Sequence, residues 1–496
     1  MFIQILAFLF VIFIIIYLKI KEIYSYWKRR NIAYVPGIFP FGSIKEPMLC
    51  RKTVGRTFWE MYREYSDEKL VGFYSPYEAM LLVRDPELSK IVHVKEFNNF
   101  ADNGFVVIRD VDPMLGINPF AIKGIPEWKD IRGIHTPLQT TIKLKSMIPE
   151  MARVAGNLIK YIESKRDKPI EVKDTTRYYT NDVVASCAYG IQSDSFFENS
   201  SFNQHTMKQM FGSDYNASYA VISGLFIPFA SKIFGFRTIS KSAQNFFESL
   251  AKTCVQHREE SGQSRSDLIQ HLMSLNKKNL ADNKTGFDSV EMAAHCMTFF
   301  IDGAETASIQ LTFTIFELAA NQNVQEKLRN EIKTAVNDVN EFDFDKLWSL
   351  QYLDMVITES MRLHPPLPFV SRTCTQQTVL GDLQIQVGTK VFTSILGFHR
   401  DPQYYPEPEK FIPERFAPEN KQNLNKDAYI PFGEGPRRCL GAKFAQTENK
   451  MALAAILLNY HLRLAEDTQV MNYDEKSTFF TAPKGKINVI FEPLAI

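Results

Sequence analysis

The sequence predicts a mainly α-helical domain with a small β part (α+β), preceded by one transmembrane helix. Three observations lead to this fold class. Residues 1–18 are almost wholly apolar, helical patterns dominate from about residue 127 to 465, and short strand-like runs occur near residues 70–83 and 381–396. A chain of 496 residues has ample core for such a domain and needs neither disulfides nor structural zinc to fold.

Composition and charge exclude several classes of protein. Lysine and arginine number 57 and aspartate and glutamate 56, so the chain lacks the basic excess of a nucleic-acid binder. Hydrophobic residues make up 45% and aromatic residues 13%, which excludes a largely disordered chain. The six cysteines are too sparse for a secreted disulfide framework and include no CxxC pair, so they indicate a reducing compartment.

The apolar N-terminal segment predicts a transmembrane signal anchor over residues 1–18. Its apolar run would span about 25 Å as a helix, close to the endoplasmic reticulum bilayer of about 27 Å. A cleaved signal peptide is the alternative, but no basic n-region precedes the run and no small-residue cleavage site follows it. The next segment, residues 19–36, is a basic linker with Lys19, Lys21, Lys28, Arg29 and Arg30. This bias predicts a single-pass anchor in the endoplasmic reticulum (microsomal) membrane, with residues 37–496 as one cytosolic domain.

The longest element predicted within residues 37–496 is a helix that could run to about residue 320. Asp288 and Glu291 form a capping-box pattern at its start, and a length of about 48 Å would let it cross the whole domain. Residues 401–418 hold five prolines, so they predict an ordered meander rather than a helix or strand. Residues 221–236 are apolar but broken by glycine and proline, which fits either a core segment or an amphipathic patch that dips into the bilayer.

One cysteine lies where its sulfur could carry chemistry. Residues 432–441 read FGEGPRRCLG, and Cys439 stands between a glycine-rich loop and a helical run over residues 442–459. A thiolate at a helix N-terminus is stabilised by free backbone N–H groups and by the helix dipole. The glycines let the backbone approach a flat ligand closely. The arrangement suits a thiolate bound to iron in a flat, carboxylate-bearing macrocycle; the alternative is an inert buried cysteine in a tight turn.

This segment resembles the haem-binding loop of the cytochrome P-450 family, Phe-x-x-Gly-x-x-x-Cys-x-Gly. Phe432, Gly435, Cys439 and Gly441 occupy its four fixed places. The resemblance extends from the anchor to the final residues, and the segments EWKDIRGIHTPLQTTIKLKSM and FGFHRDPQYYPEPEKFIPERF look most like insect microsomal members that metabolise xenobiotics. It implies a triangular, helical haem domain with a long central helix over residues 37–496, haem b as cofactor and Cys439 as the iron ligand.

A Glu-x-x-Arg pair precedes the cysteine loop. Glu359 and Arg362 share one face of a predicted helix, but the template alone is weak. It also fits Glu60 with Arg63 and Glu326 with Arg329. In the family, this helix lies at a suitable distance before the cysteine, and its pair locks onto an arginine of a PERF-like meander, here Arg415. The resemblance therefore gives Glu359, Arg362 and Arg415 a structural role beneath the haem loop.

Four side chains are expected at the haem by the same resemblance. Trp128 and Arg132 stand four residues apart in an earlier helix and so face the same way. Arg372 and Arg437 would also reach the haem propionates. Asn103 stands where insect and vertebrate drug-metabolising members often carry another arginine, so one propionate contact is in doubt.

The long helix carries the segment IDGAETAS at residues 301–308. Gly303, Glu305 and Thr306 match the family pattern Ala/Gly-Gly-x-Asp/Glu-Thr-Thr/Ser, in which the glycine lets the helix open beside the iron. A threonine hydroxyl can bond back to a carbonyl one turn earlier, and the acid–alcohol pair gives a route for protons. In isolation, such a pair is more often an ordinary polar helix edge. The resemblance makes Glu305 and Thr306 the catalytic candidates and Gly303 a cofactor contact.

Asp302 departs from the family pattern, because a small residue that faces the haem is usual there. A carboxylate at this place is costly unless it is solvated, paired or protonated. The fatty-acid ω-hydroxylating branch has a glutamate there that can form an ester with the haem. We expect Asp302 to tune substrate polarity instead, because its side chain is shorter. The substrate-pocket candidates are Phe105, Phe211, Phe299, Phe300, Asp302, Ala304, Phe369 and Phe479.

The resemblance implies a haem-thiolate monooxygenase that inserts one oxygen atom of O2 into a lipophilic xenobiotic, insecticide, hormone or lipid. No GxGxxG follows a predicted strand, so electrons must come from outside the chain. The resemblance implies NADPH and a membrane-bound NADPH–cytochrome reductase as their source, with cytochrome b5 and membrane lipid as further partners and no nucleic acid. A basic docking face could comprise Lys129, Arg132, Arg438, Lys443 and Lys450. The alternatives are a peroxide-rearranging isomerase of the same family, against which Thr306 argues, and a non-enzymatic haem sensor.

Overall fold

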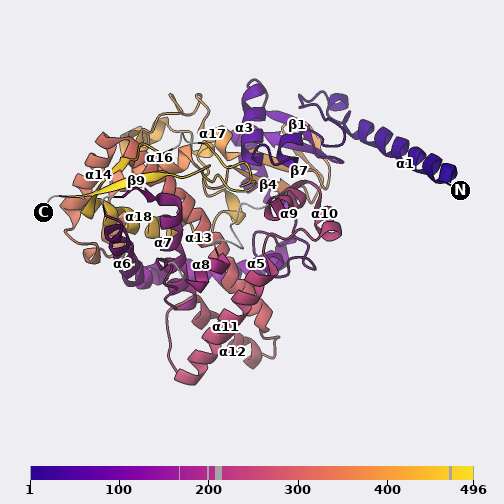
Figure 1. Ribbon diagram of the computed structural model, residues 1–496. Helices are drawn as coiled ribbons and strands as arrows, with labels where there is room; N and C mark the ends of the chain where they lie inside the picture. Colours follow the sequence, from indigo (N-terminus) through magenta and orange to yellow (C-terminus); the bar gives the residue numbers. More distant parts are fainter. Residues whose placement is uncertain (1, 167, 198–199, 207–214, 469–471, 495–496) are drawn as a thin grey trace.

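The apolar N-terminal segment stands apart from the rest of the protein. In the computed structural model, helix α1 (Phe2–Ile23) projects from the body (Figure 1). The structure describes the chain except for residues 1, 167, 198–199, 207–214, 469–471 and 495–496. Among the described residues, α1 is the one helix long and apolar enough to cross a membrane, and its apolar side chains are exposed. The helix continues past residue 18 through Lys19 and Lys21.

The basic linker after α1 is docked on the domain rather than extended. Trp27 is almost fully buried, and its Nε1–H donates to the carbonyl of Phe73 over 3.2 Å. Gly72 leaves room for that ring, because a Cβ at Gly72 would lie 2.3 Å from the Trp27 Cγ. The linker therefore fixes the base of α1 against the first strand of the domain.

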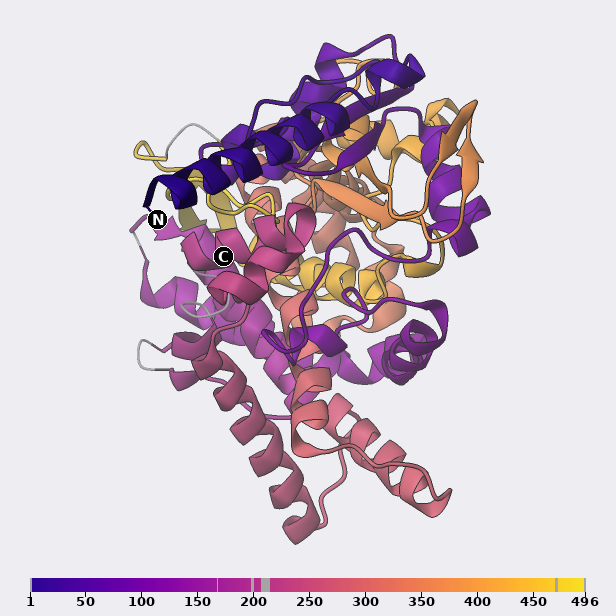
Figure 2. The ribbon, with the colours of Figure 1, turned by 90° about the vertical axis from the view of Figure 1, so that its right-hand side faces the viewer.

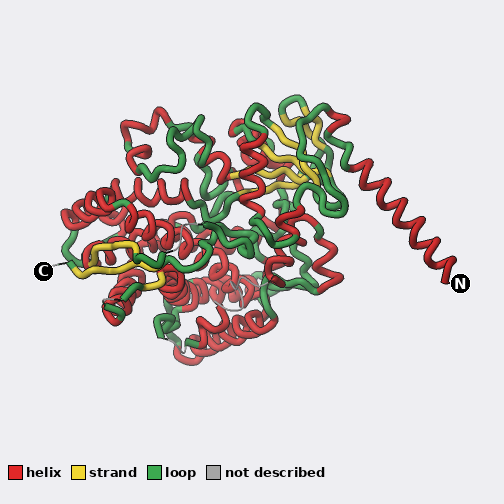
Figure 3. Tube along the Cα trace, turned by 45° about the horizontal axis from the view of Figure 1, so that its top comes forward, coloured by secondary structure: helices red, strands yellow, loops and turns green. Residues whose placement is uncertain are grey.

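Strands gather at two places, one beside the N-terminal part and one near the C-terminus (Figure 3). The larger sheet has the order β1 (Leu70–Tyr74), β2 (Ala79–Val83), β7 (Lys390–Ser394) and β4 (Phe369–Thr373). In it β2 and β7 run parallel, whereas the pairs β1–β2 and β4–β7 are antiparallel. The other sheets are β3 (Ile170–Glu171), β9 (Asn488–Pro493) and β8 (Tyr460–Leu464), and the hairpin of β5 (Thr378–Leu380) with β6 (Leu383–Ile385). The predicted strands at 381–396 are thus divided between the hairpin and β7.

Helices form most of the domain, as predicted, and they surround the central helix α13 (Figure 1). Their bounds are α2 (Lys45–Met48), α3 (Val54–Glu64), α4 (Pro86–Lys90), α5 (Ile125–His135), α6 (Thr141–Ser164), α7 (Val172–Val184), α8 (Ser201–Thr206), α9 (Tyr215–Phe226), α10 (Pro228–Phe234), α11 (Lys241–Ser261), α12 (Leu268–Ala281), α13 (Ser289–Ala320), α14 (Gln322–Ala335), α15 (Phe344–Ser349), α16 (Gln351–Leu363), α17 (Ile395–His399) and α18 (Ala442–Asn459). The meander at 401–418 contains the short 3₁₀ turn Pro413–Phe416, ends where a second one, Pro418–Asn423, begins, and is otherwise irregular.

The long central helix begins where the sequence predicts. The carboxylate of Asp288 accepts from the Glu291 N–H over 2.8 Å, and the Glu291 carboxylate accepts from the Asp288 N–H over 3.1 Å. These bonds satisfy two of the four N–H groups that a helix start leaves free. With 32 residues, α13 is about 48 Å long and packs against α7, α11, α16 and α18.

The apolar segment at 221–236 divides into two parts with different surroundings. The second half of α9 is buried, so it is a core segment. In α10, by contrast, Phe229, Ile233 and Phe234 are each more than half exposed. Figures 1 and 2 place α10 on the same side of the body as α1. The core expectation therefore holds for the second half of α9, whereas the membrane patch stays a prediction for the exposed apolar side chains of α10.

Candidate active site

The loop before α18 is a tight turn, and only glycine fits at one of its positions. The Cys439 N–H donates to the Phe432 carbonyl over 2.8 Å, and the Arg438 N–H donates to the Gly435 carbonyl over 3.0 Å. Gly435 has a φ of 69°, and a Cβ there would lie 1.9 Å from the His93 carbonyl oxygen. Gly441 follows as the N-cap of α18. The loop therefore presents the Cys439 sulfur at the N-terminus of this helix.

The Cys439 thiol lies near Asp302 of α13. Its side chain is exposed, yet desolvation by the surrounding protein raises its pKa to about 11, with a backbone hydrogen bond from Gly441 opposing the shift. Asp302 on α13 is likewise accessible, while burial raises its pKa to about 7. The two groups also interact electrostatically, since the Asp302 charge raises the pKa of Cys439. Because Cys439 and Asp302 are both exposed and desolvated, we infer that they line an internal space. A metal ion bound by Cys439 there would displace the thiol proton.

Two buried guanidinium groups belong to Arg437 and Arg372. The first of them, Arg437, is hydrogen-bonded to backbone carbonyls of the protein. Arg437 donates to the carbonyls of Ala101 (2.5 Å), Pro119 (3.0 Å) and Ile122 (2.9 Å). Burial lowers its pKa to about 10. Arg437 therefore fastens the loop at residues 101–122, a role that the sequence did not indicate.

Trp128 lies close to two cations, and one of them is Arg132, which its four-residue spacing places on the same helix face. The Arg437 guanidinium carbon stands 4.7 Å from the Trp128 ring centroid, and that of Arg132 stands 5.6 Å from it. Arg132 also donates to the Arg438 carbonyl over 2.7 Å. These contacts join α5 to the cysteine loop.

The second guanidinium, Arg372 on β4, is buried without a carboxylate partner among the described residues. It donates to the Asn103 side-chain oxygen (2.5 Å) and to the Ser371 carbonyl (2.8 Å), while its Nε–H has no hydrogen-bond partner. Burial, followed by the charge of Arg437, lowers its pKa to about 9. A buried cation with an idle donor is costly and indicates that an anion belongs beside it.

These residues fit a haem group. Cys439 supplies a thiolate ligand, and Arg372 supplies a buried cation for a carboxylate. A Cβ at Gly441 would meet nothing within 4 Å, so there is open space beside the loop for a flat ring. Asn103 does not replace the expected arginine as a cation. It orients Arg372 instead, while its own amide donates to the Phe120 carbonyl over 2.6 Å.

The segment of α13 that faces the cysteine loop contains the predicted back-bond. The Thr306 hydroxyl donates to the Asp302 carbonyl over 2.7 Å, one turn earlier. Gly303 has room around it, because a Cβ there would meet the Val184 side chain at an ordinary contact distance of 3.4 Å. Ala304 is buried in the helix packing. Thr306 and Asp302 therefore form the polar edge of this part of α13.

Glu305, the predicted acid of the proton route, is engaged elsewhere. Its carboxylate accepts from the Nε–H (2.9 Å) and the Nη2–H (2.5 Å) of Arg177 on α7, and it is 4% exposed. Such a bidentate pair fixes the orientation of the carboxylate. Arg177 was missed by sequence reasoning, since no motif links positions 128 residues apart.

Asp302 has a partner that the sequence also did not reveal. The Asn118 side-chain amide lies 3.2 Å from each carboxylate oxygen of Asp302, and Asn118 is 1% exposed. Asn118 stands in the irregular segment before α5, where no pattern marks it as functional.

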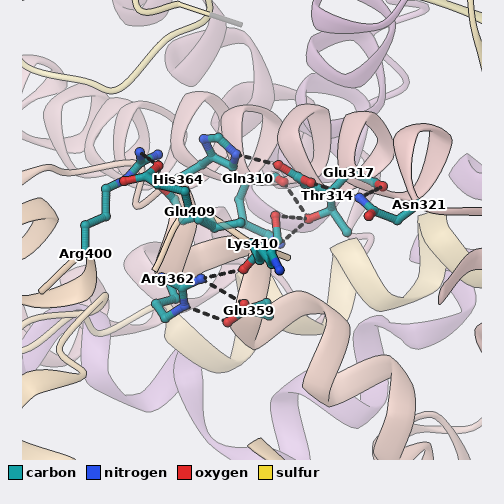
Figure 4. Close-up of polar contacts among 12 residues, drawn as sticks. Gln310, Thr314, Glu317, Asn321, Glu359, Arg362, His364, Arg400, Glu409 and Lys410 are labelled. Atoms are coloured by element: carbon teal, nitrogen blue, oxygen red, sulfur yellow. Dashed lines mark hydrogen bonds and ion pairs between the residues drawn. The ribbon is translucent and has the colours of Figure 1, made fainter. Parts of the chain in front are cut away.

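The Glu359–Arg362 pair is fully buried in α16 (Figure 4). Arg362 donates to the two Glu359 oxygens over 2.7 and 2.8 Å. Glu359 also accepts from Arg415 Nε–H over 3.3 Å and from the Ile412 N–H over 2.8 Å. The three side chains that the sequence brings together by analogy are thus in contact.

Arg362 also reaches the meander and, through it, the cysteine loop. It donates to the carbonyls of His399 (2.8 Å), Pro408 (2.8 Å) and Lys410 (3.1 Å). The His399 ring in turn accepts from the Ile430 N–H over 3.1 Å, two residues before the loop at 432–441. This chain of bonds sets the position from which the loop starts.

The phenylalanine candidates fall into three groups. Phe105, Phe369 and Phe479 form an aromatic cluster with Phe120, with ring centroids 5.4 to 6.1 Å apart. Phe299 packs against Phe444 of α18 at 5.3 Å. Phe300 is fully buried against Phe202 and Phe247, which gives its ring a core position between α13 and its neighbours α8 and α11. Phe211 lies outside the described residues.

The predicted basic face needs one correction. Lys129, Arg438 and Lys443 are exposed, and Arg132 is half-buried. Lys450, however, is fully buried: its ammonium pairs with Asp354 at 3.0 Å and lies 4.2 Å from the Trp348 ring centroid. Lys450 therefore does not belong to a docking face.

Helix α18 also carries a buried carboxyl group with no hydrogen-bond partner. Both side-chain oxygens of Glu448 lack a partner among the described residues, and the side chain is fully buried. Burial raises its pKa well above the ordinary value of 4.5. The folded protein therefore favours the protonated form of this group more strongly than the unfolded chain does.

Replacing Glu448 with glutamine is expected to stabilise the protein increasingly as pH rises. The raised pKa favours folding fully below the unfolded pKa of 4.5, and that contribution is lost as pH rises above it, by about 1.4 kcal/mol per pH unit until the folded pKa is reached. The difference in Tm between Glu448→Gln and the native protein should grow between about pH 5 and pH 8. A difference that stays constant over this range would contradict the assignment.

Comparison with known proteins agrees with this geometry. The family described as Cytochrome P450 matches residues 36–491. Cytochrome P450 6j1 of Blattella germanica is 32% identical over 92% of this chain and 91% of its own length. Cytochrome P450 9e2 of the same species is 32% identical over 90% of each chain. The probable cytochrome P450 6a19 of Drosophila melanogaster is 31% identical over 90% of each chain.

Proposed function

Since the chain belongs to the cytochrome P450 family and is a monooxygenase of that family, we propose that it inserts one oxygen atom of O2 into a lipophilic substrate with electrons from NADPH. The observation that carries the proposal is the proximity of the Cys439 thiol to Asp302, whose carbonyl also accepts the Thr306 back-bond on α13. The chain has no dinucleotide-binding pattern of its own, so an NADPH–cytochrome reductase would supply the electrons, with cytochrome b5 as a second donor.

Cys439, Arg372 and Trp128 with Arg132 would hold the haem b group, and the loop that Arg437 fastens would close one side of it. When bound, the haem supplies the iron that activates O2, and a thiolate ligand increases the electron density on that iron. The protein keeps the thiolate in place through the Cys439 N–H bond to Phe432 and the glycine turn. Arg372, held by Asn103, would pair with a haem carboxylate.

Proton movement falls to the turn of α13 that faces the space. The Thr306 Oγ1–H now donates to the Asp302 carbonyl, and the hydroxyl can also accept from and donate to a water molecule. Thr306 would thereby hold a proton at its Oγ1 and deliver it to the side of α13 that faces Cys439. Glu305 would take part only through its carboxylate pair with Arg177, so Asp302 is the nearer carboxyl group to the space.

Substrate would enter from the membrane. We assign residues 1–18 to a signal anchor, 19–36 to the linker and 37–496 to the catalytic domain, in the endoplasmic reticulum membrane. The exposed Phe229, Ile233 and Phe234 of α10 lie on the side of α1, where they would meet the acyl boundary. A lipophilic xenobiotic, hormone or lipid dissolved in the bilayer would thus reach the domain without crossing water.

The full-length, haem-loaded protein decides between this function and its alternatives. We expect a CO-difference band at the family's characteristic position and product formation that needs reductase, NADPH and O2 together. A peroxide-rearranging isomerase would convert hydroperoxides with neither reductase nor NADPH. A haem sensor would give the band but no product from any lipophilic substrate.

Reversing one charge on the basic face is expected to weaken reductase coupling. Lys443→Glu places an exposed acid beside Arg438, so the KM for reductase should rise about fivefold at low ionic strength, and the effect should shrink in high salt. Lys278→Glu on α12 is the matched control, since it changes an equally exposed lysine at the far end of the domain (Figure 1). Equal effects of the two variants would show that this face is not the docking surface.

A further inference from the structure

Asp302 is a carboxyl group near Cys439 that no cation in the described part of the chain neutralises. Among the described residues its carboxylate has one hydrogen-bond partner, the neutral amide of Asn118, and it forms no ion pair. Glu305, three residues later, has the guanidinium of Arg177 against it. A desolvated carboxylate without a cation raises the free energy of the ligand-free protein. Such a group therefore gains more from a cation on a bound ligand than a carboxylate that is already paired.

The Asp302 carboxyl group is held in place by hydrogen bonds and is therefore not a freely mobile polar side chain. Asn118 approaches both Asp302 oxygens, and its own side-chain oxygen accepts from the Phe120 N–H over 2.7 Å. The Asn118 carbonyl also accepts from the Ala121 N–H over 2.8 Å. Each carboxylate oxygen keeps a second lone pair, so the group can still accept a hydrogen bond from a ligand.

The loop that holds the carboxyl group also supplies aromatic surface. Phe120 stands two residues after Asn118 and belongs to the cluster with Phe105, Phe369 and Phe479. Ring faces attract organic cations, and their apolar area binds hydrocarbon. A fixed carboxylate near such rings is complementary to an ammonium group on an apolar frame.

We propose that Asp302, positioned by Asn118, is a specificity-determining residue that selects lipophilic amines as substrates. The ammonium N–H would donate to the Asp302 carboxylate, and the apolar frame would lie against the aromatic cluster. The proposal rests on the proposed function, because it places the oxygenated substrate in the space between α13 and the Cys439 loop.

Two matched probes test the proposal by binding rather than by turnover. One is a tertiary dimethylamine on a phenylbutyl chain, and the other is the isosteric hydrocarbon with CH in place of nitrogen. Equilibrium dialysis against the haem-loaded protein should show tighter binding of the amine, whereas an apolar pocket would prefer the hydrocarbon because the amine loses hydration. Asp302→Asn should weaken amine binding at least about tenfold and leave hydrocarbon binding within about twofold.

Asp302→Glu should keep the amine preference, and Asp345→Asn, which removes an exposed carboxylate, should leave both affinities unchanged. If Asp302→Asn takes up no haem, the proposal is tested by binding of the two probes to the native protein and to Asp302→Glu. Tighter hydrocarbon binding, or equal weakening of both probes in Asp302→Asn, overturns the proposal. The CO-difference band and NADPH-dependent turnover are measured on the same preparation. Their absence refutes the proposed function, whereas their presence without an amine preference refutes this inference alone.

Discussion

Replacing Cys439 with alanine is expected to abolish the CO-difference band of the thiolate-bound haem and all NADPH-dependent oxygenation. The sulfur is the only atom removed, and it faces the interior space rather than packed core, so the fold should survive. The loop keeps its shape because the Cys439 N–H, not its side chain, bonds to the Phe432 carbonyl. Absorption spectra of the reduced, CO-treated protein and the Tm of the variant measure both expectations.

Cys374→Ala is the matched control for this variant. Cys374 is 1% exposed, and its thiol donates to the Gln376 carbonyl over 3.0 Å, so the change should cost about 1 kcal/mol of stability and leave the band intact. A band that persists in Cys439→Ala, or that disappears in Cys374→Ala, would remove Cys439 as the iron ligand.

The sequence predicts those parts of the site that depend on neighbours along the chain. The capping box of α13, the Thr306 back-bond and the cysteine loop all join residues a few positions apart, where helix geometry and glycine freedom set the outcome. The Glu-x-x-Arg template shows the limit of this reasoning. Glu60 pairs with Lys52 and Arg56 instead of Arg63, whereas Glu359 and Arg362 pair in the core. Spacing places two side chains on one face but does not reveal whether that face is buried.

Contacts between distant segments account for what the sequence did not reveal. Arg177 meets Glu305 because α7 packs along α13, and Asn118 meets Asp302 because the irregular segment before α5 folds over the same helix. Lys450 lies two helical turns after Lys443, so periodicity puts both on one face of α18. The packing of α15 over the second position, with Trp348 against the ammonium group, buries it. Such cover comes from tertiary packing, which no local pattern encodes.

Replacing Arg362 with leucine is expected to destabilise the fold by about 3–5 kcal/mol, a large part of the stability of a typical domain. The change leaves the buried Glu359 carboxylate without its bidentate partner and frees the carbonyls of His399, Pro408 and Lys410. Because His399 also receives the Ile430 N–H, the start of the cysteine loop should loosen, and haem should be lost from the folded fraction. Urea unfolding and the rate of haem release measure the two effects.

Glu326 and Arg329, which have the same Glu-x-x-Arg spacing, provide the matched comparison, because the Glu326 side chain is exposed. Glu359→Gln should cost about 3 kcal/mol, because the substitution removes one charge of a fully buried pair that also holds Arg415. Glu326→Gln changes the same residue type at the same spacing, but the Glu326 side chain is 59% exposed, so water replaces the lost contact and the cost should stay below about 1 kcal/mol. Haem release should accelerate only in Glu359→Gln, because Glu326 has no hydrogen bond to the described part of the meander. Equal costs for the two variants would show that burial does not decide the strength of this pair.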